Sequence, residues 1–150
     1  MAGAADCIHA TCVALGGRAA LLRGPSGSGK SDLALRFLHL PSAPLGAPPQ
    51  LVGDDRVVLH PADGCLLASP PEALAGLIEV RGVGIITLPF TTAAKVCLVV
   101  DLVERGQIER LPDRSERVTI HRLELPLLRI WPFEASAPIK LARALISIRS

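Results

Sequence analysis

Aromatic side chains are scarce in this chain of 150 residues, which has three phenylalanines, one tryptophan and no tyrosine. Nucleic-acid-binding proteins use clustered basic side chains against phosphates, and those that bind single strands add aromatic rings on which bases stack. Here the formal net charge is only +2, and lysine occurs at three positions, Lys30, Lys95 and Lys140. The composition therefore argues against nucleic acid as a partner.

Long apolar runs are also missing, although 49% of the residues are hydrophobic. A helix needs about 20 consecutive apolar residues to span a bilayer, and the longest clean apolar stretch here covers only residues 96–100. Residues 1–6 contain neither the basic segment nor the apolar core of a secretory signal. We therefore expect a cytoplasmic protein with no membrane partner. The length predicts one domain over residues 1–150.

Cysteine pairs with metal-binding spacing are absent. The four cysteines show no C-x-x-C spacing and lie in apolar surroundings, at Cys7, Cys12, Cys65 and Cys97. Free cysteine behaves as a small hydrophobic side chain. We therefore expect these residues to be buried, with no metal or disulfide among them.

A phosphate-binding pattern is present. The pattern G-x-x-x-x-G-K-[ST] is matched at every fixed position by Gly24, Pro25, Ser26, Gly27, Ser28, Gly29, Lys30 and Ser31. In such a P-loop, backbone N–H groups surround a phosphate, the lysine reaches the β- and γ-phosphates, and the hydroxyl ligates Mg²⁺. The flanks fit, with a strand expected at 18–23 and a helix at 32–38 whose N-terminal dipole favours anions. The alternative is a Gly/Ser turn before a helix; the full match predicts nucleotide binding.

Most of the chain is expected to form strands. They are predicted at 8–15, 18–23, 50–53, 56–60, 65–68, 77–88 (interrupted by two glycines), 95–103, 118–125 and, after Pro126, 127–131. The helix after the P-loop should stop near Leu40 because prolines follow, leaving an exposed loop at 41–49. One or two helical turns are expected at 70–76, and a terminal helix at 137–148. Helices are nearly absent between residues 50 and 130, so the alternating strands and helices of a doubly wound fold are not expected.

Three acidic segments could serve the metal that a P-loop requires. Asp101 ends the apolar run 96–100, as in an ordinary Walker B strand. Asp54 and Asp55 end a second apolar run, and two adjacent carboxylates repel each other unless a cation lies nearby. In a strand, Glu79 and Arg81 would share one face, which suits a metal–phosphate site. The alternatives are a solvated turn for the aspartate pair and a surface ion pair for Glu79 and Arg81.

Taken together, these segments resemble the catalytic, C-terminal domain of HPr kinase/phosphorylase. The resemblance covers residues 8 to about 111 in four motifs: Ile8-His9, the P-loop followed by an acidic residue, residues 51–57, and residues 79–86, which match E-[IV]-R-G-x-G-I-I. It implies an α/β fold of α+β character, similar to phosphoenolpyruvate carboxykinase: a P-loop beside a strand-rich mixed sheet with few helices.

The resemblance also implies roles for single residues. Asp54 would be the base acting on the seryl hydroxyl, with His9 lying against it. Mg²⁺ would be held by Ser31, Asp55 and Glu79. Arg81 would contact phosphate, and Arg110, in a further family-like segment at 109–111, would stabilise charge on the phosphoryl group in transfer. Asp101 would then be a buried strand residue and not a metal ligand.

The implied activity is an ATP- and Mg²⁺-dependent serine kinase acting on the phosphocarrier protein HPr or a paralogue, with phosphate-driven dephosphorylation as the reverse reaction. The alternatives are a small-molecule kinase on the same scaffold and a nucleotide-binding regulatory module without catalysis. The family's N-terminal domain has no counterpart before the P-loop, as in a short form found in alphaproteobacteria. The family forms a hexamer, so a homo-oligomer is a further expectation. The carrier, the effectors and the preference among ATP, GTP and pyrophosphate are left open by the sequence.

Overall fold

The computed structural model describes residues 4–113 and 115–148. A sheet of nine strands contains most of this part of the chain, in the order β1-β5-β6-β9-β3-β2-β4, with β11 also paired to β9 and β10 paired to β11. A separate hairpin is formed by β7 and β8. The strands are β1 (Asp6–Ile8), β2 (Thr11–Leu15), β3 (Arg18–Arg23), β4 (Pro49–Gly53), β5 (Val57–Ala62), β6 (Cys65–Ser69), β7 (Leu77–Val80), β8 (Gly84–Thr87), β9 (Ala94–Leu102), β10 (Arg117–Ile120) and β11 (Leu123–Ile130).

Within the described residues there are two α-helices, α1 (Lys30–Leu38) and α2 (Ala137–Ser147), and three short 3-10 turns at Ala43–Leu45, Glu72–Leu74 and Arg105–Gln107. The expectation of a strand-rich mixed sheet with few helices is confirmed. Neither helix is long and apolar enough to cross a membrane, a finding that covers the described residues only.

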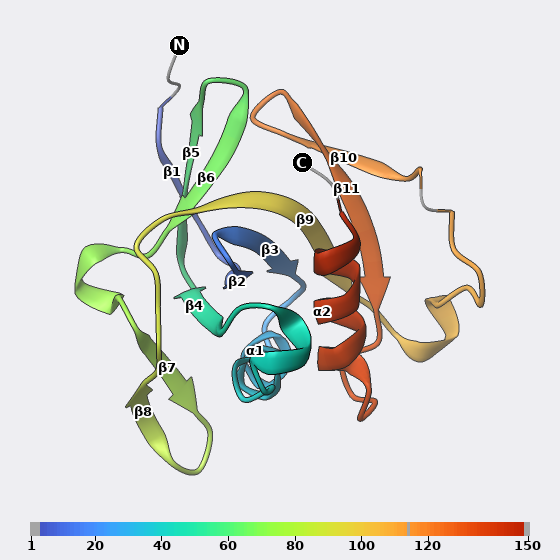
Figure 1. The fold of residues 1–150 in the computed structure, drawn as a ribbon, viewed down its shortest axis with the longest axis horizontal. Helices are drawn as coiled ribbons and strands as arrows, with labels where there is room; N and C mark the ends of the chain where they lie inside the picture. The colour runs from blue at the N-terminus through green and yellow to red at the C-terminus, as the bar shows by residue number, and fades with distance from the viewer. Residues whose placement is uncertain (1–3, 114, 149–150) are drawn as a thin grey trace.

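The central strands are buried on both faces, which explains their uninterrupted apolar sequence. On β3, Ala20 and Leu22 face a core shared with α1 and α2, while Ala19 and Leu21 face a second core on the opposite side. The two helices lie side by side against the first face (Figure 1). The second face is covered by β5, β6 and the hairpin of β10 and β11, so the sheet curls around its own centre.

Strand directions bring several chain segments to one edge of the sheet. β3 is parallel to β9 and antiparallel to β2, and β2 is antiparallel to β4. β3, β4 and β9 therefore run in the same direction, and their carboxyl ends meet at the edge where the P-loop begins. This edge lies beside the hairpin of β7 and β8, which projects from the rest of the molecule (Figure 1).

Two of the predicted strands are divided differently in the structure. The predicted strand 8–15 is split into β1 and β2, which pair with different neighbours. The predicted break at Pro126 is wrong: β11 continues through it, and the chain turns instead at His121 and Arg122, whose φ angles are 50° and 65°. Pro126 is tolerated because it is the last residue of β11 that pairs with β10, and pairing with β9 begins only at Leu127.

The expected burial of the cysteines is only partly correct. Cys12 and Cys97 are buried, Cys65 is partly exposed and Cys7 is exposed on the edge strand β1; all four are free. Burial raises the pKa of the Cys12 thiol far above its usual range.

Candidate active site

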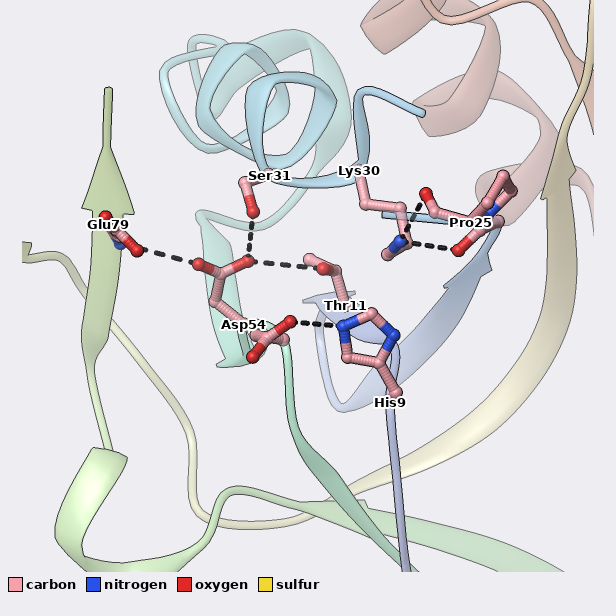
Figure 2. Close-up of polar contacts among 9 residues, drawn as sticks. His9, Thr11, Pro25, Lys30, Ser31, Asp54 and Glu79 are labelled. Carbon is pink, nitrogen blue, oxygen red and sulfur yellow. Dashed lines mark hydrogen bonds and ion pairs between the residues drawn. The ribbon is translucent and has the colours of Figure 1, made fainter. Parts of the chain in front are cut away.

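The P-loop connects β3 to α1 and curls around its own lysine. Lys30 Nζ donates hydrogen bonds to the carbonyl oxygens of Gly24 at 2.6 Å and Pro25 at 3.1 Å (Figure 2). Gly27 and Gly29 have φ angles of 82° and 99°, in the left-handed region that glycine adopts without a steric cost. The loop therefore leads its backbone directly into the N-terminus of α1, which is the geometry that a phosphate site requires.

Asp54 connects the P-loop to β2 and β7. Its Oδ1 accepts hydrogen bonds from Ser31 Oγ at 2.6 Å and from Thr11 Oγ1 at 3.2 Å, and its Oδ2 accepts one from the backbone N–H of Glu79 at 3.4 Å. In Figure 2 the Asp54 carboxylate lies between these three partners, which come from α1, β2 and β7. Thr11 is fully buried. Asp54 is thus fixed beside the hydroxyl that a P-loop presents to Mg²⁺.

His9 lies against Asp55 and not against Asp54, which corrects the contact expected from the sequence. Its Nε2 is hydrogen-bonded to Asp55 Oδ1. Asp55 has a φ of 66°, in the left-handed region, and shares no hydrogen-bond partner with Asp54 among the described residues. The backbone N–H of Ala10 donates to the Asp55 carbonyl at 3.2 Å and holds the two segments together. Both side chains are open to solvent, with 51% of His9 and 65% of Asp55 exposed.

Glu79 and Arg81 belong to the projecting hairpin. Glu79 lies in β7, whereas Arg81 lies in the turn after that strand, so the prediction that both project from one strand is wrong. Ile78 is buried and anchors β7 to the first core. Both charged side chains nevertheless reach the same cavity.

These residues share a cavity of about 500 Å³. Its wall combines the P-loop and α1 with the ends of β1, β2, β4 and β7 and with one residue from the segment before α2; it consists of His9, Thr11, Ser26, Gly27, Gly29, Lys30, Ser31, Asp32, Leu35, Asp54, Asp55, Glu79, Val80, Arg81 and Phe133. The wall is rich in carboxylates, which repel one another unless a cation lies among them. An arrangement of phosphate-binding loop, hydroxyl and carboxylates suits a metal-bound nucleotide.

Two of the charged residues named from the sequence lie elsewhere. Arg110 is on an exposed segment and does not line the cavity, so its role stays a prediction. Asp101 forms an ion pair with Arg23, with Arg23 Nε 2.8 Å from Asp101 Oδ1 and Nη2 3.1 Å from Oδ2. Asp101 is partly buried at the end of β9 and also lies outside the cavity wall.

Thr11 and Phe133 are among the cavity residues that the sequence motifs did not select. A lone threonine in a strand carries no sequence signal. Phe133 follows Trp131 and Pro132 in a segment that matches none of the motifs. Only the folding of that segment against α1 brings it to the P-loop.

The donor atoms in the cavity fit Mg²⁺. Among the residues that the structure describes, no group of three or more His, Cys, Asp or Glu side chains could enclose a metal. Mg²⁺ in phosphoryl-transfer sites is usually held by one or two carboxylates together with phosphate oxygens and water. Ser31, Asp54 and the nearby Glu79 supply hard oxygen ligands of this kind.

Comparison with known proteins identifies the family. The family model "HPr Serine kinase C-terminal domain" matches residues 2–146. The chain belongs to this family. The chain is similar to the HPr kinase/phosphorylase of Streptococcus thermophilus, with 31% identity over an alignment that covers 82% of this chain and 41% of the relative. The HPr kinase/phosphorylase of Limosilactobacillus reuteri is 32% identical over 94% of this chain and 43% of its own length. This member of the HPr serine kinase C-terminal domain family thus spans about two fifths of the curated relatives it matches.

The fold agrees with that assignment. A solved structure described as the HPr(Ser) kinase/phosphatase from Coxiella burnetii matches with a TM-score of 0.75 and 24% identity, covering 92% of each chain. At this identity the likeness concerns the fold. The predicted family and the predicted fold class are both confirmed.

Proposed function

We propose that the protein is a cytoplasmic, ATP- and Mg²⁺-dependent serine kinase whose substrate is an HPr-type phosphocarrier protein, and that it also catalyses the phosphate-driven reverse reaction. One observation carries the proposal. The Asp54 carboxylate is hydrogen-bonded to the P-loop hydroxyl of Ser31, while a second acid, Asp55, lies next to it on the open side of the same cavity. This is the minimum that phosphoryl transfer requires: a phosphate-binding loop, a metal-side carboxylate and a base for the acceptor.

The contacts favour exchanging the roles that the resemblance implies for the two aspartates. Asp54 contacts the Ser31 hydroxyl, so we assign it, with Ser31 and Glu79, to the Mg²⁺ side. Asp55 is paired with His9 and faces solvent, so we assign it as the base that takes the proton from the seryl hydroxyl. A positioned base acts within hydrogen-bond reach of the proton it removes, and Asp55 is the aspartate that an incoming hydroxyl can approach. In the reverse reaction the protonated Asp55 would return that proton to the departing serine.

The remaining groups act on the phosphates. Lys30 and the backbone N–H groups of the loop would bind the β- and γ-phosphates, and Arg81 on the hairpin would contact the phosphoryl group. Ser31, Asp54 and Glu79 would hold Mg²⁺, which would supply positive charge next to the phosphates. The chemistry then depends on positioning and charge neutralisation.

The open acceptor side favours a protein substrate over a small molecule. His9 and Asp55 are more than half exposed, and the adjoining hairpin carries Val83 and Ile85 at 72% and 70% exposure. A small-molecule kinase would need a closed pocket around its acceptor to exclude water. Here the acceptor side is a rim that a protein surface could cover.

The test is transfer of label from γ-labelled ATP to an HPr-type phosphocarrier in the presence of Mg²⁺. We expect label on one serine, lost when that serine is replaced by alanine in the carrier and lost with the Lys30→Ala kinase. Addition of inorganic phosphate to the labelled carrier should release the label in a reaction that also needs Lys30. Label that appears in a small metabolite would support the small-molecule kinase, and ATP binding without any transfer would support a regulatory module.

A further inference from the structure

One wall of the cavity exposes an aromatic ring. Phe133 lines the cavity and is 60% exposed, although a phenylalanine is usually buried. It follows β11 in the segment that leads into α2, and no motif of the sequence includes it. An exposed apolar side chain in the wall of a ligand cavity is expected to contact what binds there.

The ring is held firmly against the P-loop. A Cβ placed on Gly29 would lie 3.1 Å from Phe133 Cε1 and 3.3 Å from Pro132 Cγ, so the ring and the proline pack directly on that glycine. Arg36 of α1 donates hydrogen bonds to the carbonyl oxygens on both sides of Phe133, those of Pro132 and Glu134. A further bond from Arg36 Nε to Asp32 Oδ2, at 3.0 Å, orients the guanidinium. The ring therefore lies on a segment that is hydrogen-bonded to α1, the helix that begins at the P-loop.

The segment that carries Phe133 and the strand that carries Glu79 lie on different sides of α1. β7 and Glu79 are on one side of α1, and the segment before α2 is on the other (Figures 1 and 2). If the nucleotide binds as proposed above, its γ-phosphate lies toward Asp54 and Asp55, at the acceptor side. The rest of the nucleotide then extends away from these carboxylates, toward the flank that carries Phe133.

We propose that the Phe133 ring is the surface on which the nucleoside part of the nucleotide packs, so that Phe133 makes the site prefer a nucleotide over an inorganic polyphosphate. The inference rests on the proposed function. A base stacks on an aromatic ring through its π-face, an interaction that needs no hydrogen-bond partner and is lost on truncation to alanine. Removal of the ring should therefore weaken nucleotide binding by about 10-fold or more, without changing how the phosphates are bound.

The experiment compares two ligands by calorimetry with the full chain: Mg-ADP and Mg-tripolyphosphate, which has phosphates but no nucleoside. With Phe133→Ala we expect the affinity for Mg-ADP to fall about 10-fold or more and the affinity for tripolyphosphate to stay at the wild-type value. Phe133→Tyr, which keeps the ring, should retain the wild-type affinity for Mg-ADP. Ile139→Ala is the matched control, because Ile139 is 53% exposed on α2 and does not line the cavity.

Several outcomes would overturn the inference. If Phe133→Ala lowers the affinity for both ligands equally, the ring acts by maintaining the conformation of the P-loop. If the affinity for both ligands is unchanged, the ring has no role in binding. Thermal melting of each variant shows whether a loss reflects unfolding, and Phe133→Leu, which keeps an apolar side chain but has no ring, provides the same comparison of the two ligands if Phe133→Ala does not fold. Failure of the proposed function looks different: the wild-type protein would then bind neither ligand, or Lys30→Ala would bind tripolyphosphate as well as the wild type does.

Discussion

Two strands of this molecule end in the same way and serve different purposes. β4 and β9 are both apolar, both run parallel to β3, and each is followed or ended by an aspartate at the edge of the sheet that carries the P-loop. Asp54, after β4, bonds to the P-loop hydroxyl of Ser31. Asp101, in β9, is directly beside the P-loop strand but is paired with Arg23, the residue that precedes Gly24.

Asp54 and Asp101 differ in their hydrogen-bond partners and not in the strands that carry them. A carboxylate that is paired in two hydrogen bonds with an arginine already has its charge neutralised by the guanidinium, so it attracts a metal cation less strongly. Asp54 is bonded instead to two hydroxyls and an amide, which are weaker partners than a guanidinium. An apolar strand that ends in aspartate is therefore a poor guide to the metal ligand unless the neighbouring cation is also identified.

The largest expected effect tests whether the P-loop, which lies at the ends of these two strands, binds phosphate. Lys30→Ala should abolish measurable Mg-ATP binding in calorimetry, because the ammonium group serves the β- and γ-phosphates. The fold should be kept, as judged by circular dichroism, since the lysine makes hydrogen bonds only to carbonyls of its own loop. If folded Lys30→Ala binds Mg-ATP with wild-type affinity, the P-loop is not the phosphate-binding site.

The next prediction distinguishes the role of Asp54 from that of Asp55. Asp55→Asn should reduce the rate of phosphoryl transfer on the order of 10²- to 10⁴-fold and leave Mg-ATP affinity nearly unchanged, because a base acts only in the transition state. Asp54→Asn should instead raise the Mg²⁺ concentration needed for half-maximal rate, with partial rescue by excess Mg²⁺. The reverse pattern would restore the roles that the family resemblance implies.

A smaller effect is expected from substitution of Asp101 in β9. Asp101→Asn should leave the transfer rate close to that of the wild type and lower the free energy of unfolding by roughly 0.5–1 kcal/mol, since the pair with Arg23 is partly exposed and screened. Glu79→Gln, assayed in parallel, should weaken Mg²⁺-dependent turnover. If Asp101→Asn causes a large loss of turnover in a folded protein and Glu79→Gln has no effect, the metal ligand is Asp101 of β9 and not Glu79.

The smallest effect concerns an exposed ion pair outside the cavity, between Glu116 and Arg129 of β11. The Arg129 guanidinium hydrogen-bonded to Glu116 lowers the pKa of that carboxyl below its usual range. A lowered pKa means that the pair stabilises the fold above the ordinary pKa of glutamate and loses this contribution as the pH falls through the folded-state pKa. Glu116→Gln should therefore lower the melting temperature slightly at pH 7 and at low salt, and the difference should vanish once the pH has fallen below the folded-state pKa of Glu116. A difference that persists in acid would mean that Glu116 acts through packing.

Local sequence signals predicted the parts of the fold that depend on neighbouring residues. The strand 18–23, the P-loop and the helix after it were predictable because glycine, proline and apolar runs act within a few residues. The turn at His121 and Arg122 was missed because both residues are in the left-handed region, where glycine or asparagine would have been expected. The sequence predicts a break at Pro126 because a strand tolerates a proline only where its missing N–H is not needed for pairing, and the local sequence does not show which residues are paired.

The site was predictable as a set of residues but not as a set of contacts. The family motifs selected His9, Asp54, Asp55, Glu79 and Arg81, and all five line the cavity. Which aspartate His9 contacts depends on the left-handed backbone at Asp55, and no sequence pattern specifies that conformation there. The pairing of Arg23 with Asp101 joins residues far apart in the chain, and that pairing follows only from the parallel register of β3 and β9.

The parallel pairing of β3 with β9 also determines when the molecule can acquire its function. Arg18 pairs with Lys95 and Arg23 with Asp101, so the strand that leads into the P-loop gains this neighbour only after most of the chain is available. β9 in turn pairs with β11 at residues 127–130. Pairings between distant segments form slowly, because a long loop must close before they are stabilised. During synthesis, the P-loop sequence would emerge before β9 and β11 and would lack their structural support until both strands have left the ribosome.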